Sequence, residues 1–284
     1  MLSILIPVYN YNVLPLLEEV HKQAVECNIN FEIIVIDDAS TEKHYNADQI
    51  HALSYTKLIC LKQNIGRSSI RNLLAKKAIY DNLLFIDSGT FPKLNTFLTS
   101  YLEELDKPVV IGGMIEKENK PQKPFILRWL YTKKREANTN KDVLSSANFL
   151  IKKSHIESHP FNEDLKSYGY EDLIFFKNLK TNSIKLHFIN NPVIHDGQEN
   201  ATTFIKKTES GLLNLKTLVL SHKPLVDDNK IIKLHRKLKS LHLDYLVATI
   251  FKLSKPLLFK NFNSSKPSLI LFDFYKLGYF CNIK

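Results

Sequence analysis

The stretch Leu83–Pro92 constrains the fold of this 284-residue chain most, because it joins a buried strand to a polar end. Leu83–Ile86 is a short apolar run, typical of a strand buried on both faces. The run ends at Asp87, Ser88-Gly89 supplies turn residues, and Pro92 suits the first turn of a following helix. In an open α/β sheet, ligands bind beyond the carboxyl ends of the strands. Asp87 is therefore placed either to meet a ribose hydroxyl or a metal–phosphate group, or simply to cap a turn.

The same arrangement recurs at two earlier apolar segments. Leu2–Val8 ends at Tyr9-Asn10, and Phe31–Ile36 ends at Asp37-Asp38. Successive side chains of a strand point to opposite faces, so only one of these two acids should face the crevice. Turn and helix-cap chemistry remains an equal alternative for this pair. Three strand ends in succession with polar side chains indicate a ligand crevice more strongly than one does.

Helical and strand patterns alternate along the first 220 residues. Helices are predicted at Val13–Cys27, from Gly66 to about Tyr80, at Phe97–Leu105 and at Thr202–Ser221, and further strands at Lys57–Leu61, Val109–Met114, Ser145–Ile151, Ile184–Ile189 and Pro192–Ile194. Such alternation predicts an α/β fold with right-handed crossovers and a mostly parallel central sheet flanked by helices.

Several classes of protein are excluded by what the sequence lacks. The turn after the first strand, Pro7–Asn12, has no glycine for a dinucleotide pyrophosphate, and no P-loop is present. The three cysteines have no metal-ligand spacing, which suits a reducing cytoplasm. The first strand starts at Leu2, so we expect no signal peptide, and no apolar run is long enough to span a bilayer.

Most of the net charge of +10 lies near the C-terminus. Residues 223–284 contain 12 Lys and Arg against 4 Asp, or +8. We expect two domains, a catalytic domain over 1–222 and a basic, aromatic-rich helical tail over 223–284. An amphipathic basic pattern from Ile231 to Tyr245 and an aromatic segment, Ser268–Phe280, favour binding to an anionic membrane surface over a solvated helical hairpin. A nucleic-acid partner is not expected, because no base-reading motif is present.

Four motifs in order carry a family resemblance. They are Ser3–Asn10 (SILIPVYN), Ile36–Thr41 (IDDAST), Asn64–Asn72 (NIGRSSIRN) and Phe85–Ser88 (FIDS). Together they resemble family 2 of the inverting glycosyltransferases, which have the GT-A fold, and the resemblance extends to about residue 220. It implies a nucleotide-sugar donor whose nucleotide is bound by Pro7, Tyr9, Asp38, Asn64, Gly66, Arg71 and Asp87.

One position departs from the family pattern. The family strand usually ends in Asp-x-Asp, whose last acid holds a divalent metal, whereas this chain has Asp87-Ser88-Gly89. The resemblance therefore implies Mg²⁺ or Mn²⁺ as cofactor, held by Asp87 and by His195, which follows a strand, or a metal that is weak or absent. A binding protein without activity is the alternative that Gly89 raises.

The reacting groups are assigned from two further segments. Tyr168–Asp172 closely resembles the Gly-x-Glu-Asp motif of the family, which implies Asp172 as general base and Glu171 as an acceptor-binding residue; acids in the first turn of a helix are also explained by the helix dipole. The basic segment Lys117–Asn140 is interpreted as a solvated loop or as a mobile segment over the diphosphate. Lys133, Arg135 and the strand residue Asn148 are candidate diphosphate or acceptor contacts.

The sequence thus predicts an inverting transferase that moves a sugar, expected to be UDP-linked, to a hydroxyl of a glycan or lipid-linked glycan. The basic tail places it at the inner face of the cell membrane, as a peripheral cytoplasmic protein active in polysaccharide biosynthesis.

Overall fold

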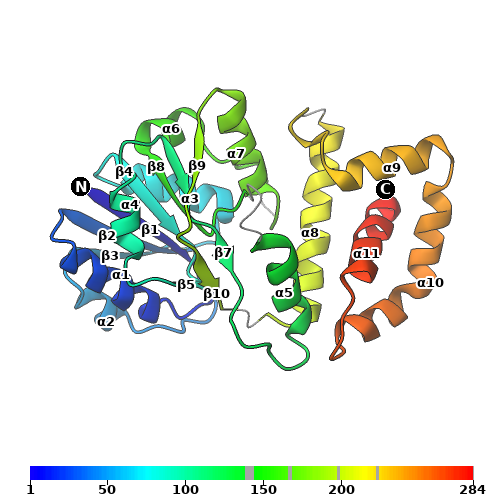
Figure 1. Cartoon of the computed structure of the whole chain (residues 1–284), viewed down its shortest axis with the longest axis horizontal. Helices are drawn as coiled ribbons and strands as arrows, with labels where there is room; N and C mark the ends of the chain where they lie inside the picture. Colours follow the sequence, from blue (N-terminus) through cyan, green and yellow to red (C-terminus); the bar gives the residue numbers. More distant parts are fainter. Residues whose placement is uncertain (138–143, 166–167, 197–198, 222–223, 284) are drawn as a thin grey trace. The chain divides into compact units, whose positions relative to one another are not determined.

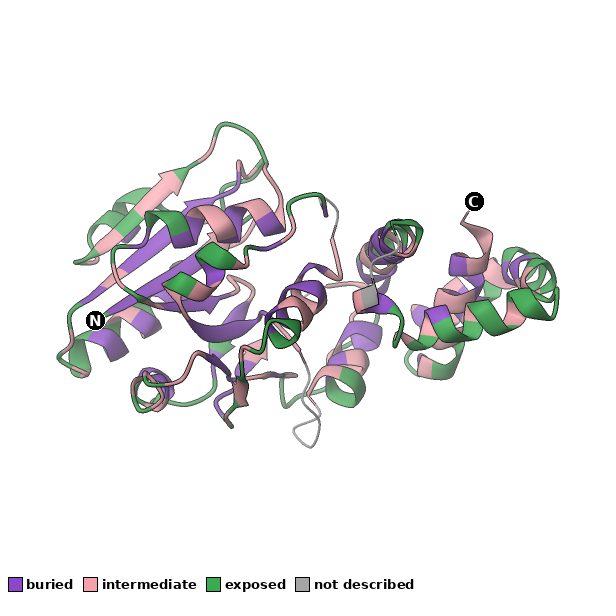
Figure 2. Cartoon of the chain, turned by 90° about the horizontal axis from the view of Figure 1, so that it is seen from above, coloured by how far each residue is buried: buried purple, intermediate pink, exposed green. Residues whose placement is uncertain are grey.

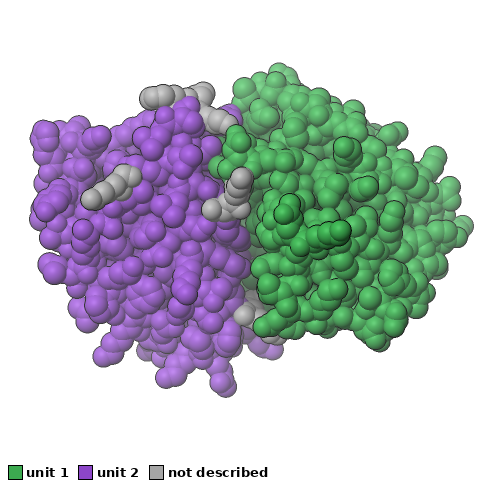
Figure 3. Space-filling view, turned by 180° about the vertical axis from the view of Figure 1, so that it is seen from behind, with its two compact units in different colours: residues 1–116, 136–166, 171–196 green, residues 117–135, 167–170, 197–284 purple. Residues whose placement is uncertain are grey.

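The computed structural model describes residues 1–137, 144–165, 168–196, 199–221 and 224–283. The described residues form two compact units (Figure 3). Unit 1 contains residues 1–116, 136–166 and 171–196, and unit 2 contains 117–135, 167–170 and 197–284. The domain boundary is expected between residues 222 and 223, and both residues are outside the described ranges. Residues 138–140 of the basic segment Lys117–Asn140 are also outside them. The segment 117–135 and the helix after residue 200 are grouped with the C-terminal helices.

Unit 1 is an α/β structure, as predicted (Figure 1). Its elements are β1 (Leu2–Val8), α1 (Leu14–Glu26), β2 (Phe31–Asp37), α2 (Ala47–His51), β3 (Thr56–Cys60), α3 (Arg67–Lys77), β4 (Asn82–Ile86), β5 (Thr90–Pro92), α4 (Phe97–Leu102), β6 (Val109–Ile111), β7 (Met114–Ile115), β8 (Asn148–Lys152), α6 (Lys153–Ser158), α7 (Glu171–Thr181), β9 (Leu186–Phe188) and β10 (Val193–His195).

The central sheet explains where a ligand can bind. Among the described residues it has the strand order β3-β2-β1-β4-β8-β6-β9, and β5-β10-β7 form a small second sheet. The pairs β1–β2, β2–β3, β1–β4 and β6–β9 are parallel, whereas β8 is antiparallel to β4 and β6. The strand order reverses at β1, with β2 on one side and β4 on the other, and such a switch point opens a crevice at the carboxyl ends of the strands.

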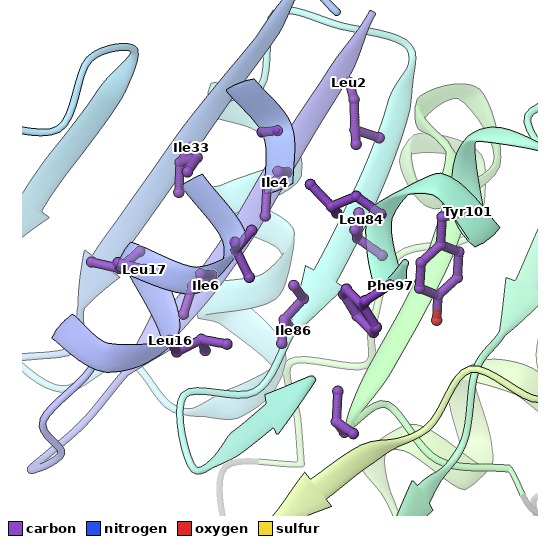
Figure 4. Packing of buried hydrophobic residues seen from close by; sticks show 14 of the residues in the cluster. Leu2, Ile4, Ile6, Leu16, Leu17, Ile33, Leu84, Ile86, Phe97 and Tyr101 are labelled. Atoms are coloured by element: carbon purple, nitrogen blue, oxygen red, sulfur yellow. The ribbon is translucent and has the colours of Figure 1, made fainter. Parts of the chain in front are cut away.

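Alternating side chains of the strands build two hydrophobic cores, and Figure 2 shows the central strands largely buried. Ile4 and Ile6 of β1 pack in a core with Leu16 and Leu17 of α1, and with side chains of α4 (Figure 4). Leu5, between them in sequence, belongs to the opposite core with side chains of α3 and α7. The alternation of side chains along the strand therefore places successive residues of β1 in opposite cores.

The structure corrects two expected elements of unit 1. Pro92 does not start a helix, because Thr90–Pro92 pairs as β5 with β10. The strand expected at Val109–Met114 is divided into β6 and β7 by Gly112 and Gly113, and Gly113 has a φ of +85°, a left-handed conformation that suits glycine.

Unit 2 is helical in its described residues. It contains α5 (Ile126–Tyr131), a π-helical turn η1 (Thr132–Glu136), α8 (Ala201–Leu220), a 3₁₀ turn η2 (Pro224–Val226), α9 (Lys230–Ser240), α10 (Asp244–Phe262) and α11 (Leu269–Asn282). The basic segment, interpreted from the sequence as a solvated loop or as a mobile segment over the diphosphate, contains helical turns between residues 126 and 136. None of the described helices is long and apolar enough to cross a membrane.

Aromatic side chains form the core of unit 2. Phe251 and Phe262 of α10 pack with Phe272 and Tyr275 of α11, and Tyr275 donates a hydrogen bond to Glu209 Oε1 of α8 at 2.5 Å. The aromatic segment Ser268–Phe280, which the sequence predicts to contact a membrane, therefore has most of its rings inside unit 2. Its buried rings stabilise the helical packing and are not available to lipid.

We predict that Gly112→Ala destabilises unit 1 strongly. A Cβ at this position would lie 2.4 Å from Tyr101 Oη, 2.5 Å from Asn191 O and 2.6 Å from Asn148 Oδ1, all in a buried network. Overpacking of this kind costs about 1–3 kcal/mol. Gly89→Ala is the control, because its Cβ would meet only the Tyr11 ring at 3.9 Å. Denaturant unfolding of both variants tests this, and equal stabilities would contradict it.

Candidate functional site

The turns after β1 and β2 are tied to each other at the crevice end of the sheet. Asn10, in a left-handed conformation with φ +48°, donates its backbone N–H to Ser40 Oγ at 2.8 Å. Its side-chain oxygen accepts from Glu42 N at 3.2 Å. These bonds fix the polar loop that follows each strand, and they leave Tyr9 about half exposed at 49%.

Asp37 and Asp38 are both buried and have different partners. Asp37 accepts from Ser40 N at 2.7 Å and from the Tyr45 hydroxyl, so it is a turn residue. Asp38 accepts from Ile65 N at 2.7 Å and from Gly66 N at 3.0 Å. The Asp38 carboxylate therefore anchors the loop that leads into α3.

An ion-pair network joins α3, the end of β4 and the start of α7. Arg71 Nη2 donates to Asp87 Oδ1 at 2.6 Å, and Arg67 Nη2 donates to Asp87 Oδ2 at 3.2 Å. Arg67 Nε lies 2.7 Å from Glu171 Oε1, and Arg71 Nη1 lies 4.0 Å from the same oxygen. Arg71 and Glu171 are almost fully buried, with 1% and 4% of their side chains exposed, whereas Arg67 is 38% exposed. Arg67 is thus the guanidinium that a ligand can reach.

Aromatic packing holds α7 in place. Phe175 stacks on Phe161 with ring centroids 3.8 Å apart, and Phe176 meets Phe149 of β8 edge to face at 5.3 Å. Asn72 of α3 exchanges two hydrogen bonds with the backbone of Phe161. The start of α7 is therefore positioned by side chains of unit 1.

Asp172, the second residue of α7, is a carboxyl with a raised pKa. Its burial is the largest cause that raises the pKa of this carboxyl, and the negative charge of Glu171 is the second; the resulting pKa is about 6. The hydrogen bond from the Leu173 N–H and the positive charges of Arg67 and Arg71 lower the pKa and so limit the rise. Asp172 Oδ1 accepts the Leu173 N–H at 2.7 Å. A carboxylate with a pKa near 6 is ionised at neutral pH and is a stronger base than an ordinary aspartate.

Gly89 lies beside the end of β10. Its carbonyl accepts from Asp196 N at 3.0 Å, and His195 is paired with Thr90 of β5. Tyr11 donates to Asp196 Oδ2 at 2.5 Å, and burial together with this carboxylate raises the pKa of Tyr11, which therefore stays a donor. A side chain at position 89 would have room next to the Tyr11 ring.

The described acids and imidazoles fit only a weak divalent site. The Asp87 carboxylate already binds two guanidinium groups, Gly89 offers no carboxylate, and no group of three His, Cys, Asp or Glu within the described ranges could hold a metal ion. Asp87 and His195 could hold Mg²⁺ or Mn²⁺ only if the ion took its remaining ligands from phosphate oxygens and water, as Mg²⁺ does in many phosphate sites.

Three of the residues expected to contact a ligand have other partners in the structure. Asn148 is fully buried, accepts from Tyr101 Oη at 3.0 Å and donates to Asn191 O at 3.1 Å, so it does not face a ligand. Arg135 pairs with Asp273 at 2.7 Å, within unit 2. Glu171 is buried against Arg67, which favours a positioning role over acceptor binding.

The other predicted nucleotide-binding residues of unit 1 lie at strand ends, in the loop before α3 or within α3, and Lys133 belongs to unit 2. Pro7 belongs to β1, and Asn64 and Gly66 lie in the loop that Asp38 holds, where Asn64 Nδ2 donates to Asp38 O at 3.0 Å. Arg71 has only 1% of its side chain exposed, and its Nη2 lies 2.6 Å from Asp87 Oδ1. Lys133, in unit 2, lies over the Trp129 ring, with Nζ 4.8 Å from its centroid.

Sequence reasoning missed three residues of the site, Arg67, Tyr11 and Asp196. Arg67 could have been found, because it precedes Arg71 by four residues and so shares its helix face. The bond between Tyr11 and Asp196 joins residues 185 apart in sequence, and no local pattern predicts it.

The comparisons with solved structures give fold-level similarity. The mannosyltransferase PcManGT from Pyrobaculum calidifontis, solved with GDP-Man and Mn²⁺, is 13% identical with a TM-score of 0.59 and covers 99% of this chain and 84% of its own. GalNAc-T7, solved with UDP, GalNAc and Mn²⁺, is 15% identical with a TM-score of 0.50 over 69% and 43% of the two chains. S. aureus TarS 1–349 is 21% identical with a TM-score of 0.49 over 75% of this chain, which spans 65% of the TarS chain.

A search of the curated proteins gives no match. The family model Glycosyl transferase family 2 matches residues 3–159, just over half of the chain. This range holds the ends of β1, β2 and β4 and both arginines of α3. The fold is that of the GT-A glycosyltransferases, and the chain belongs to glycosyl transferase family 2.

Proposed function

We propose that this protein is an inverting glycosyltransferase that moves a sugar from a nucleotide-diphosphate donor, UDP-linked, to a hydroxyl of a glycan or lipid-linked glycan. The observation that carries the proposal is Asp172, a carboxyl whose pKa is raised to about 6 at the start of α7. Asp172 follows Glu171 in sequence, and Glu171 forms an ion pair with Arg67. Arg67 also pairs with Asp87 at the end of β4. The nucleotide complexes of the fold neighbours PcManGT and GalNAc-T7 support a nucleotide-sugar donor.

In the proposed mechanism, Asp172 accepts the proton of the acceptor hydroxyl as its oxygen attacks the anomeric carbon. The bond from that carbon to the diphosphate breaks on the opposite face, which inverts the configuration. Glu171 and Asp87 hold the Arg67 guanidinium at the site, where its positive charge would stabilise the departing diphosphate.

The nucleotide is assigned to the loops that Asp38 and Asn10 hold together. Tyr9 is about half exposed and could contact a base, Pro7 lies near the end of β1, and Asn64 and Gly66 lie in the loop before α3. Asp38 keeps lone pairs beyond the two N–H groups that it accepts, so a ribose or base donor could still bind it.

A divalent ion, if bound, would neutralise charge on the diphosphate, with Asp87 and His195 as its protein ligands. The Mn²⁺ in the PcManGT and GalNAc-T7 structures supports this assignment. The missing acid at Gly89 favours a weak site, and it also motivates the second candidate function, a nucleotide-sugar-binding protein without turnover. Release of free sugar or transferred product from a UDP-sugar panel distinguishes the enzyme from the binding protein.

We further propose that the protein works at the inner face of the cell membrane in polysaccharide biosynthesis. The exposed lysines of α9, which include Lys233, Lys237 and Lys239, support a contact with anionic lipid. Such a position would bring unit 1 to a lipid-linked acceptor.

Asp172→Asn is predicted to reduce transfer by about 100-fold or more, because an amide cannot accept the proton. The parent should gain activity as the pH rises through about 6 and level off above it, since the base works only when ionised. Initial rates from pH 5 to 8 and calorimetric UDP affinity check both points. Asp164→Asn, at an exposed acid, is the matched control. Near-normal turnover of the Asp172 variant would refute the assignment.

Gly89→Asp is predicted to lower the metal concentration needed for half-maximal transfer. The new carboxylate would have room beside Tyr11 and would add a charged ligand near Asp87. His195→Ala should raise that concentration, and Gly89→Asn controls for size without charge. Metal titrations of the transfer rate, with Mn²⁺ binding followed by electron paramagnetic resonance in the presence of UDP, measure both effects. Full activity of the parent in excess chelator would remove Asp87 and His195 from the metal assignment.

A further inference from the structure

Exposed apolar side chains are concentrated in the C-terminal helices. Twenty large hydrophobic residues of the described chain are exposed, and ten of them lie between Leu234 and Leu271. Figure 2 shows exposed residues along these helices. Single exposed apolar residues are ordinary on protein surfaces, but a concentration of them marks an interaction site.

Four of these residues form one stripe on α10. Their spacing of four, three and four places them on one face of the helix; they are Leu246, Ile250, Leu253 and Leu257, with exposures of 53%, 46%, 78% and 71%. The buried side chains of α10 are Ala248, Phe251, Leu258 and Phe262. At about 100° per residue, the two sets point in roughly opposite directions. The helix is therefore apolar toward its own core and apolar toward solvent.

Lysines without acidic partners accompany the stripe. Lys252 and Lys260 of α10 and Lys266 after it are exposed and make no ion pair with another described residue. The same holds for Lys233, Lys237 and Lys239 of α9. By contrast, Arg236, Lys255 and Lys276 pair with Asp227, Glu209 and Asp273. The partner of this surface should therefore be both apolar and anionic.

We infer that α10 lies in the surface of an anionic lipid bilayer, with Leu246, Ile250, Leu253 and Leu257 among the upper acyl chains and the lysines at the phosphate headgroups. An apolar helix face flanked by lysines is typical of such interfacial helices. A second copy of this chain fits less well, because a two-fold contact through the same face would bring the lysines of both copies together.

This inference extends the proposed function, since it names the surface that would hold the enzyme near a lipid-linked acceptor. It also changes the contact expected from the sequence. The rings of Phe272 and Tyr275 are internal, and the aliphatic side chains of α10 take their place.

The test is co-sedimentation of the full chain with vesicles of phosphatidylcholine alone or with one quarter phosphatidylglycerol. The parent should bind the anionic vesicles, less as salt rises, and the double variant Leu253→Asp/Leu257→Asp should lose about tenfold or more in partitioning. Lys252→Glu/Lys260→Glu should weaken binding through charge alone. Ile79→Asp, at a 70% exposed position of unit 1, should bind like the parent. Melting temperatures near that of the parent show that the variants are folded.

Three results would overturn the inference. The first is equal vesicle binding by the parent and the Leu253→Asp/Leu257→Asp variant, and the second is no vesicle binding by the parent. The third is a parent that is dimeric in sedimentation equilibrium while this variant is monomeric, which would assign the stripe to a second copy. Calorimetry with UDP separates these outcomes from the proposed function, because loss of vesicle binding with intact UDP affinity leaves the transferase proposal in place.

Discussion

The candidate site depends on the burial of Arg71 between Asp87 and Glu171. A guanidinium with 1% of its surface exposed has lost its hydration, and only closely placed carboxylates can compensate for that loss. Removing one member of such a buried set typically costs about 3–5 kcal/mol, because the others are left as unpaired charges. The network therefore fixes three segments at once, the first turns of α3, the end of β4 and the start of α7.

The same network sets the electrostatics of the neighbouring acid. Glu171 raises the pKa of Asp172 through its charge, after burial, and the two arginines limit that rise. A base with a pKa near 6 results from this balance. Arg67 is the more exposed of the two arginines, so the site keeps one positive group within reach of an anionic ligand even though position 89 carries no acid.

Both units bury aromatic rings in their cores, but unit 2 also exposes a row of aliphatic side chains on α10. Phe161, Phe175 and Phe176 stabilise the start of α7 in unit 1, and Phe251, Phe262 and Phe272 fill the core of unit 2. In unit 2 the outer face of α10 keeps Leu246, Ile250, Leu253 and Leu257 exposed to solvent. The exposed surface of α10 is therefore aliphatic, whereas the aromatic rings of unit 2 are buried in its core.

The sequence by itself determined the fold class, because strand and helix patterns that alternate along the chain predict a mostly parallel sheet flanked by helices. It also determined the family, since each motif is a short contiguous stretch at a strand end or a helix start. Only the tertiary structure decided that Asp37 bonds to Tyr45, that Asn148 is internal and that Arg67 reaches Glu171. Arg67 and Glu171 are separated by about a hundred residues, and no local periodicity encodes how two such segments pack. The exposure of Leu253 was undetermined for the same reason, because a leucine pattern predicts a helix face but not what covers it.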